Sequence, residues 1–460
     1  MPVNGAKATI EGGDARAALP PGPRLPKAVQ AWRWTRNPLP FLDRCRRDHG
    51  DAFTLRISHA GTWVVLSDPE DVKRVFTAEP ARMGVSEPNA ILRPLLGRRS
   101  VMLLEEPEHM TRRRFILPPF HGKRMEGYAD MMTEVTQHEV ARWPVGEPFE
   151  LWPRMQSITL DVVMRVTFGD VDSPELQRLR TLLAELTDWL NNPRRLGVLA
   201  VLGPRWIAHN HGFRQVRGRV EEAVLDEVRR RRAAGTAEEG DDIVGLLAQA
   251  RYPDGEPLSD EDLSDELITL LSDGPTSTSL AWAFERLMRH PEKLDRLREE
   301  ILAGDDDAYL DAVVKETLRL CPPVPVVVRR LLDPMELGGH LIPAGTTVAP
   351  CVYLMHRRED VYPDPYAFRP ERFLDRAPGT YTWIPFGGGV RRCLAASFAT
   401  QEMKRVLRNV LAEVDLRAAG SGSERVARSS IAFVPDRQAL AVVKGRTPRG
   451  RALAGERGPA

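Results

Sequence analysis

The 460-residue sequence has only four cysteines, almost no net charge and no long apolar run. Four cysteines are too few for a disulfide scaffold, and they form no closely spaced metal-binding pattern. The formal charge of +1, from 65 basic and 64 acidic residues, gives no reason to expect a nucleic-acid partner. No window approaches the roughly 20 apolar residues that cross a bilayer. We therefore expect a cytoplasmic protein without a membrane anchor.

Apolar residues, by contrast, are abundant. With 42% hydrophobic content the chain can bury a large core. We predict one domain over residues 26–445, preceded by a flexible segment over 1–25 and followed by a tail over 446–460. This tail is rich in Gly, Arg and Pro and is predicted to be disordered. We expect a monomer.

The hydrophobic periodicity is mainly helical, with a small β region. Residues 53–57 and 62–66 alternate around a short turn and predict a hairpin, and Asp68 precedes a predicted helix. Strand-like runs over 324–352 are split by glycine and proline turns. A helical pattern runs from 128 to 232. It is predicted to break at four prolines, Pro144, Pro153, Pro193 and Pro204.

Cys393 lies in residues 384–395, a stretch with three glycines and two arginines. Glycines let a backbone approach a flat ligand, and guanidinium groups bind carboxylates. A helix-like run starts at Ala395. The N–H groups at a helix N-terminus, together with nearby arginines, lower the pKa of a thiol. The stretch therefore predicts an anionic macrocycle that carries a metal bound by sulfur.

This stretch resembles the haem-binding signature of the cytochrome P-450 superfamily, the haem-thiolate monooxygenases. Four signature positions match: Phe386, Gly389, Arg391 and Cys393. The last position departs, because Ala395 stands where the family has glycine. The resemblance implies haem b with Cys393 as its axial thiolate and metal ligand. It also implies that Phe386, Gly387 and Arg391 contact the haem.

The resemblance also implies which residues bind the two haem propionates. His109 and Arg113 are four residues apart, which puts them on one helix face. They match the family's H-x-x-x-R pair. By the same resemblance, Arg329 and Arg391 complete the set. Four cationic or donor groups for two carboxylates are a chemically sensible count.

A second family motif, E-x-x-R, occurs at Glu316 and Arg319. The two residues are three apart on a helix predicted over 309–320, so they share a face. Taken alone, the pair could equally be a weak surface salt bridge. Arg372 lies in a segment that resembles the family's P-E-R-F sequence. The resemblance implies a triad that supports the haem side of the scaffold without taking part in the chemistry.

The long helix that crosses the haem in this family is expected to begin near Ser259. Its central motif departs from the family's A-G-x-D/E-T-T, because the acidic residue is missing and Pro275 replaces the first threonine. Pro275 disfavours an unbroken helix. Thr276, Ser277 and Asp273 are the candidate catalytic residues for proton delivery. The alternative is that Thr276 and Ser277 only bond to backbone carbonyls.

The resemblance implies a triangular, mainly helical fold with a small β region. It also implies a monooxygenase that activates O2 with two externally supplied electrons. The expected substrate is a hydrophobic small molecule, a terpenoid, fatty acyl or macrocyclic product of secondary metabolism, which is hydroxylated or epoxidised. No flavin- or nicotinamide-binding fingerprint appears. The expected partners are therefore a ferredoxin and a ferredoxin reductase, with NAD(P)H as the ultimate donor. The predicted docking face contains Arg391, Arg392, Arg112 and Lys404.

Two other functions stay open at this point. A peroxide-driven peroxygenase, or a haem-dependent isomerase or dehydratase, would need no proton relay for O2. A haem-binding sensor would show no turnover. The substrate itself is not determined. The segments expected to line its chamber are mainly aliphatic and span residues 84–104, 190–207, 267–276, 324–328 and 431–434.

Overall fold

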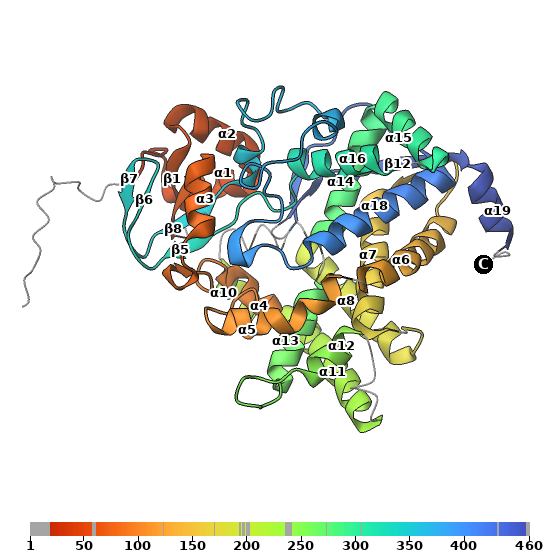
Figure 1. The fold of residues 1–460 in the computed structure, drawn as a ribbon, viewed down its shortest axis with the longest axis horizontal. Helices are drawn as coiled ribbons and strands as arrows, with labels where there is room; N and C mark the ends of the chain where they lie inside the picture. The colour runs from red at the N-terminus through yellow and green to blue at the C-terminus, as the bar shows by residue number, and fades with distance from the viewer. Residues whose placement is uncertain are drawn as a thin grey trace, which may run out of the picture.

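A computed structural model describes most of the chain, and helices dominate it, with small sheets gathered mainly at one side (Figure 1). Within this described part, no helix is long and apolar enough to cross a membrane. The described residues are 19–57, 61–122, 124–169, 171–192, 195, 198, 203–234, 242–272, 274–304, 306–429 and 432–456.

The helices follow the chain in two groups. The first group is α1 (Lys27–Arg36), α2 (Pro38–His49), α3 (Pro69–Thr77), α4 (Arg93–Leu96), α5 (Glu108–Ile116), α6 (Arg124–Ala141), α7 (Leu151–Phe168) and α8 (Pro174–Asn191). The second group is α10 (Pro204–His209), α11 (His211–Ala234), α12 (Ile243–Gln249), α13 (Asp260–Leu271), α14 (Pro275–Arg289), α15 (Pro291–Ala303), α16 (Ala308–Leu320), α17 (Val352–Met355), α18 (Ala396–Glu413) and α19 (Pro448–Glu456).

The largest sheet has the strand order β1-β2-β8-β5-β3, in which only β2 and β8 run parallel. Its strands are β1 (Ala52–Ile57), β2 (Gly61–Leu66), β3 (Met83–Gly84), β5 (Arg329–Leu331) and β8 (Thr347–Pro350). The smaller sheets combine β4 (Pro148–Glu150) with β12 (Leu440–Arg446) and β9 (Val414–Ala418), β6 (Met335–Leu337) with β7 (His340–Ile342), and β10 (Val426–Ser429) with β11 (Ala432–Pro435). The predicted hairpin of β1 and β2 is confirmed.

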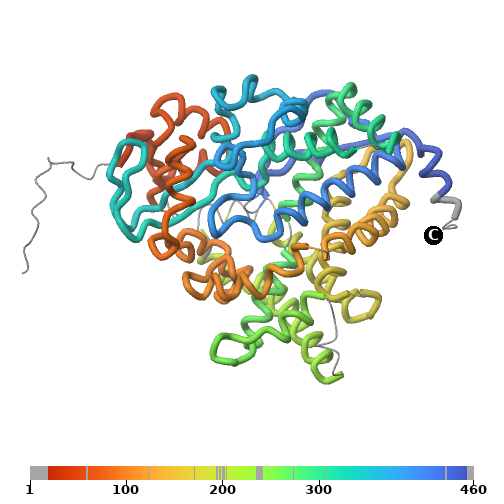
Figure 2. Tube along the Cα trace, viewed as in Figure 1, coloured from red at the N-terminus to blue at the C-terminus, as the bar shows by residue number. Residues whose placement is uncertain are grey.

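Apolar side chains from distant segments build the core. The main cluster joins α6, α7, α14, α16 and α18, and it includes Met155, Phe284 and Leu407, each 0% exposed. Figure 2 shows α18 running beside α6, although the two are far apart in the sequence. A second cluster, with Phe53 and Leu55, lies between the large sheet and helices α1 and α2. The core therefore fixes α14, α16 and α18 relative to one another.

Local capping explains where two important helices begin. The Asp68 carboxylate accepts hydrogen bonds from the N–H groups of Glu70 and Asp71 and starts α3, as the sequence predicts. Ser259 and Asp262 form a reciprocal capping box at the start of α13. The predicted start of the distal helix near Ser259 is thus confirmed.

The distal helix does not continue as one element. α13 ends at Leu271, and α14 begins at Pro275 as a new helix. Proline suits the first turn of a helix, because its missing N–H would have no intrahelical partner there. The break therefore follows from Pro275. Pro153, in contrast, was predicted to interrupt a helix and instead occupies the first turn of α7.

Residues near both ends of the predicted domain make backbone and side-chain contacts. Part of the segment predicted to be flexible is fixed on β1, because the Thr54 N–H donates to Pro21 O at 2.9 Å and its hydroxyl donates to Pro20 O at 2.6 Å. Residues 1–18 of that segment, and Pro193, lie outside the described residues. The tail predicted to be disordered contains α19. The Thr447 hydroxyl caps this helix by accepting from the Gly450 N–H at 3.0 Å.

Candidate functional site

The loop that carries Cys393 is closed by its own backbone and lies against α3. The Cys393 N–H donates to Phe386 O at 2.9 Å. Gly389 has a positive φ of 67°, and a Cβ there would lie 2.1 Å from the carbonyl oxygen of Phe76. Only glycine fits that position. The close approach holds the loop under α3 and fixes the direction in which it enters α18.

Neighbouring positions explain the rest of the signature. Gly387 also has a positive φ, of 69°. Ala395 has φ −91° at the N-cap of α18, a conformation that alanine adopts without strain. The departure from the family signature at this position therefore has no conformational cost. The half-buried Phe386 ring lies edge-on to Trp383, with the ring centroids 6.2 Å apart.

The four cysteines differ in exposure. Burial raises the pKa of Cys45 and of Cys351 to about 12 and also raises the pKa of Cys321, so these three stay protonated thiols at neutral pH. Cys393 is the exposed one. A metal binds the thiolate form of cysteine. Accessibility therefore favours Cys393 as the metal ligand.

A cluster of basic side chains gathers at the N-terminal part of α5. The Arg391 guanidinium donates from Nη1 to Leu104 O at 2.7 Å, and its Nη2 lies 3.3 Å from Glu106 Oε1. His109 Nδ1 lies 2.7 Å from the same Glu106 oxygen. Burial, followed by the charge of Arg391, lowers the pKa of His109 to about 4, so His109 is neutral at pH 7. Motif spacing did not reveal Glu106, which connects the two predicted ligands.

The other two predicted propionate ligands join the same cluster. Burial, followed by the Arg391 charge, lowers the pKa of Arg329 to about 10. Arg113 is half-buried. Burial lowers the pKa of Arg113, whereas the electrostatic interaction with Cys393 raises it. Arg391 Nη2 is buried, and its 3.3 Å contact with Glu106 Oε1 is an ion pair without the geometry of a hydrogen bond, so this donor makes no hydrogen bond within the described residues. Mutually repelling cations with an unsatisfied donor fit an anionic ligand, and the two propionates of haem supply that charge.

The E-x-x-R motif forms a buried triad, so the surface alternative is excluded. Arg319 donates to both carboxylate oxygens of Glu316, at 2.7 and 2.9 Å, and both residues are 0% exposed. Arg372 lies 3.2 Å from Glu316. His356 connects this triad to the Cys393 loop: its Nε2 accepts from the Ile384 N–H at 2.8 Å, and its Nδ1 lies 3.2 Å from Arg319 O. Sequence patterns did not identify His356.

Arg112 does not belong to the docking face predicted for it. Its side chain is 1% exposed and pairs with Asp262 and Glu266 of α13. Arg391 is also largely buried, with 11% of its side chain exposed. Arg112 is buried because α13 places the carboxylates of Asp262 and Glu266 against the inner face of α5. Burial raises the pKa of Glu266 to about 8 in this cluster.

The predicted proton-delivery residues have different environments. Thr276 and Ser277 are buried in the first turn of α14, whereas Asp273 lies outside the described residues. The Ser277 hydroxyl donates to Gly274 O at 3.0 Å, which supports the backbone-bonding alternative for Ser277. The sequence prediction did not include Thr278, whose buried hydroxyl has no hydrogen-bond partner within the described part of the chain.

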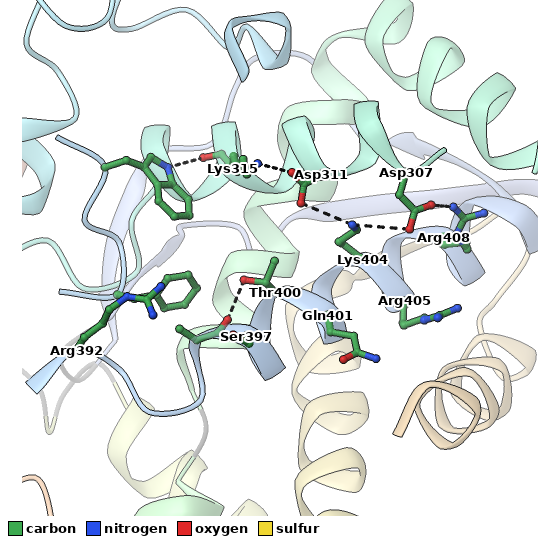
Figure 3. Close-up of a pocket in the computed structure, with 13 residues that line it drawn as sticks. Asp307, Asp311, Lys315, Arg392, Ser397, Thr400, Gln401, Lys404, Arg405 and Arg408 are labelled. Carbon is green, nitrogen blue, oxygen red and sulfur yellow. Dashed lines mark hydrogen bonds and ion pairs between the residues drawn. The ribbon is translucent and has the colours of Figure 1, made fainter. Parts of the chain in front are cut away.

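A cavity of about 500 Å³ opens beside the Cys393 loop, between α16 and α18. Figure 3 shows Lys404 between Asp307 and Asp311, at 3.7 and 3.6 Å from their oxygens, while Arg392 and Arg405 lie apart from this group. Arg408 pairs with Asp307 as well. Arg392 and Arg405 also line this cavity, and neither forms an ion pair with Asp307 or Asp311.

Comparisons with known proteins agree with this arrangement. A family profile described as "Cytochrome P450" matches residues 19–438. The chain is 38% identical to "Putative cytochrome P450 135B1" of Mycobacterium tuberculosis over 437 residues, which cover 93% of this chain and 92% of that protein. It is 37% identical over 404 residues to "Putative cytochrome P450 137" of the same species, with coverages of 86% and 83%.

Two solved structures are similar in fold. One is described as "Retinoic acid bound cyanobacterial CYP120A1", with a TM-score of 0.79, 23% identity and coverages of 93% and 99%. The other is a mutant heme domain of cytochrome P450DA, with a TM-score of 0.77, 25% identity and coverages of 94% and 99%. The mainly helical fold, the thiol loop and the profile match lead to one conclusion. The chain belongs to the cytochrome P450 family, the haem-thiolate proteins that hold iron protoporphyrin IX through a cysteine.

Proposed function

We propose that this P450 is a monooxygenase that inserts one oxygen atom from O2 into a hydrophobic small molecule, using two electrons from a separate protein. The main support for this proposal is a cluster of basic side chains beside the exposed Cys393. The cluster consists of His109, Arg113, Arg329 and Arg391. In this proposal, Cys393 is the thiolate ligand and the other four residues hold the propionates, with Phe386 and Gly387 beside the macrocycle. When bound, haem supplies the oxygen-activating chemistry.

The protein's own contribution on the distal side is assigned to the start of α14. The backbone break before Pro275 places the buried Thr276 in the first turn of a helix. We assign Thr276 the delivery of protons for oxygen reduction. The Ser277 hydroxyl donates to Gly274 O, so we assign Ser277 a backbone-bonding role. The aliphatic character of the segments expected to line the chamber supports an apolar substrate, of the terpenoid, fatty acyl or macrocyclic type.

The proposed function can be tested by changing the source of electrons. Purified protein should convert an apolar substrate with NADPH, a ferredoxin and a ferredoxin reductase, and conversion should cease when any one of them is omitted. Hydrogen peroxide alone should support a much lower rate. If peroxide gives the same rate as the complete system, the protein is a peroxygenase. The broken distal helix and the backbone-bonded Ser277 are the observations that favour that second candidate. Binding of haem without any turnover would indicate a sensor.

Thr276→Ala should uncouple oxygen consumption from product formation. Substrate binding should stay nearly unchanged, because the hydroxyl acts in the transfer step. Product formed per NADPH consumed should fall about 10-fold or more, with a matching rise in hydrogen peroxide. Ser277→Ala is the matched control and should stay coupled, because Gly274 O already accepts its hydroxyl hydrogen. Full coupling in Thr276→Ala would contradict the assignment.

We further propose that ferredoxin docks on the cavity rim that carries Arg392 and Arg405. This revises the predicted face, because Arg112 is buried and Lys404 is paired with acidic residues. Two basic side chains that have no ion-pair partner among the described residues attract an acidic protein, and salt screens that attraction.

Reversing both rim charges should weaken ferredoxin docking. For Arg392→Glu with Arg405→Glu, we expect the KM for ferredoxin to rise about 10-fold at low salt, since steering by opposite charges is lost. The dependence of the KM on ionic strength should also flatten. Arg56→Glu, at an exposed position of β1, is the control and should change neither quantity. An unchanged KM in the double variant would place the docking surface elsewhere.

A further inference from the structure

Glu106 is a buried carboxylate inside the basic cluster that is assigned to the haem propionates. Only 12% of its side chain is exposed. Its Oε1 atom lies 2.7 Å from His109 Nδ1 and 3.3 Å from Arg391 Nη2. Its Oε2 atom accepts a hydrogen bond from the Met110 N–H at 3.3 Å. Glu106 therefore contacts two of the residues that are assigned to the propionates.

Two chain segments fix the position of this carboxylate. Glu106 lies two residues before α5, and the bond from the Met110 N–H holds its side chain against the first turn of that helix. Arg391 comes from the Cys393 loop, and it donates to Leu104 O at 2.7 Å on the same side. The negative charge of Glu106 is therefore held where the Cys393 loop meets α5.

Glu106 lowers the net charge of this cluster by one unit. Burial, followed by the charge of Arg391, lowers the pKa of His109 to about 4, so a proton on His109 does not cancel the charge of Glu106 at pH 7. The carboxylate of Glu106 adds to the two propionates of a bound haem. Opposite these carboxylates stand three cations, Arg113, Arg329 and Arg391.

The preceding residue, Glu105, has a different environment. Its two carboxylate oxygens accept hydrogen bonds from the N–H groups of Val85 and Ser86, at 2.8–3.1 Å. Backbone donors therefore stabilise the charge of Glu105. The charge of Glu106, in contrast, lies directly against His109 and Arg391.

We propose that Glu106 sets the reduction potential of the bound haem and holds it lower than the arginines alone would. Reduction converts iron(III) to iron(II) with one electron, which reduced ferredoxin loses, and no bond is formed or broken. A negative charge in a partly buried site opposes the addition of that electron. The inference rests on the proposed monooxygenase function, and it names a residue that controls acceptance of the first electron.

Glu106→Gln tests the proposal, because it removes the charge and keeps the shape of the side chain. The potential of the haem-loaded protein is measured by spectroelectrochemistry, without substrate or ferredoxin. At a fixed applied potential, the ratio of reduced to oxidised protein should rise about 10-fold, the order of magnitude for one partly buried charge. This ratio corresponds to an upward shift of about 59 mV for one electron. Glu106→Asp keeps the charge and should stay close to the unmodified protein.

Glu108→Gln is the matched control, because it makes the same change two residues away on an exposed side chain. The Glu108 side chain is 63% exposed and lies 3.9 Å from Arg99. Water and salt screen that charge, so its loss should leave the potential unchanged. The absorption band with carbon monoxide should keep its position in all three variants. A constant band separates a change of potential from a change of iron ligand.

Three results would overturn the proposal. They are an unchanged potential in Glu106→Gln, an equal rise in Glu108→Gln, and loss of haem from Glu106→Gln. In the last case the carboxylate would be needed to hold the haem and not to set its potential. Failure of the monooxygenase function would appear differently, as absent turnover with ferredoxin while the difference in potential between Glu106→Gln and the unmodified protein remains.

Discussion

Replacing Cys393 with alanine should abolish the absorption band that defines thiolate ligation in the reduced, carbon monoxide-bound protein. Cys393 is exposed, while burial raises the pKa of Cys45 and Cys351 to about 12. No other cysteine is therefore ready to supply a thiolate. The visible spectrum of the reduced protein, recorded with and without carbon monoxide, measures the effect.

Cys45→Ala serves as the control for this experiment. Cys45 is buried in the cluster between α1, α2 and the large sheet, so its loss should leave the band intact. A band that survives in Cys393→Ala would mean that another group binds the iron. In that case the assignment of the whole loop, including Phe386 and Gly387, would be wrong.

The second large effect is expected in the buried triad. Arg319→Ala should give apoprotein or aggregate, because removing one partner of a buried ion pair destabilises the fold by roughly 3–5 kcal/mol. Glu316 would then be stranded at 0% exposure. Because His356 connects Arg319 to Ile384, the Cys393 loop should also lose its support. Haem content per protein and the free energy of unfolding measure the two effects.

An exposed ion pair provides the contrast. Arg44 and Asp48 are 3.4 Å apart, with side chains 64% and 48% exposed, and such a surface pair contributes little to stability. Arg44→Ala should therefore keep its haem. Glu316→Gln, which keeps the volume of the side chain but not its charge, should lose haem as Arg319→Ala does. Soluble, fully haem-loaded Arg319→Ala would show that the triad is dispensable.

Several features could be predicted from the sequence because their causes are local. These features depend only on residues that are close in the sequence. They are the glycines of the Cys393 loop, the capping residues Asp68 and Ser259, and the three-residue spacing of Glu316 and Arg319. A residue's backbone preferences and its neighbours on a helix turn determine such features. The structure shows the two caps and the ion pair of Glu316 and Arg319 where these patterns predict them, whereas the spacing alone did not predict that the pair is buried.

Other features depend on partners that are distant in the sequence. Arg112 resembles a surface arginine in its own segment, and only α13, 150 residues away, turns it into a buried ion-pair residue. His356 likewise gains its role from contacts with Arg319 and Ile384, 37 and 28 residues away. Local spacing cannot encode such contacts.

The same division applies to the function. The sequence by itself determined the mainly helical family fold, the glycine- and arginine-rich loop around Cys393 and the departure of the distal motif at Pro275. The tertiary structure decided that Pro275 starts a separate helix and that Glu106 joins His109 to Arg391. The physical reason is that charge, burial and hydrogen bonding depend on neighbours in space, which only the folded chain brings together.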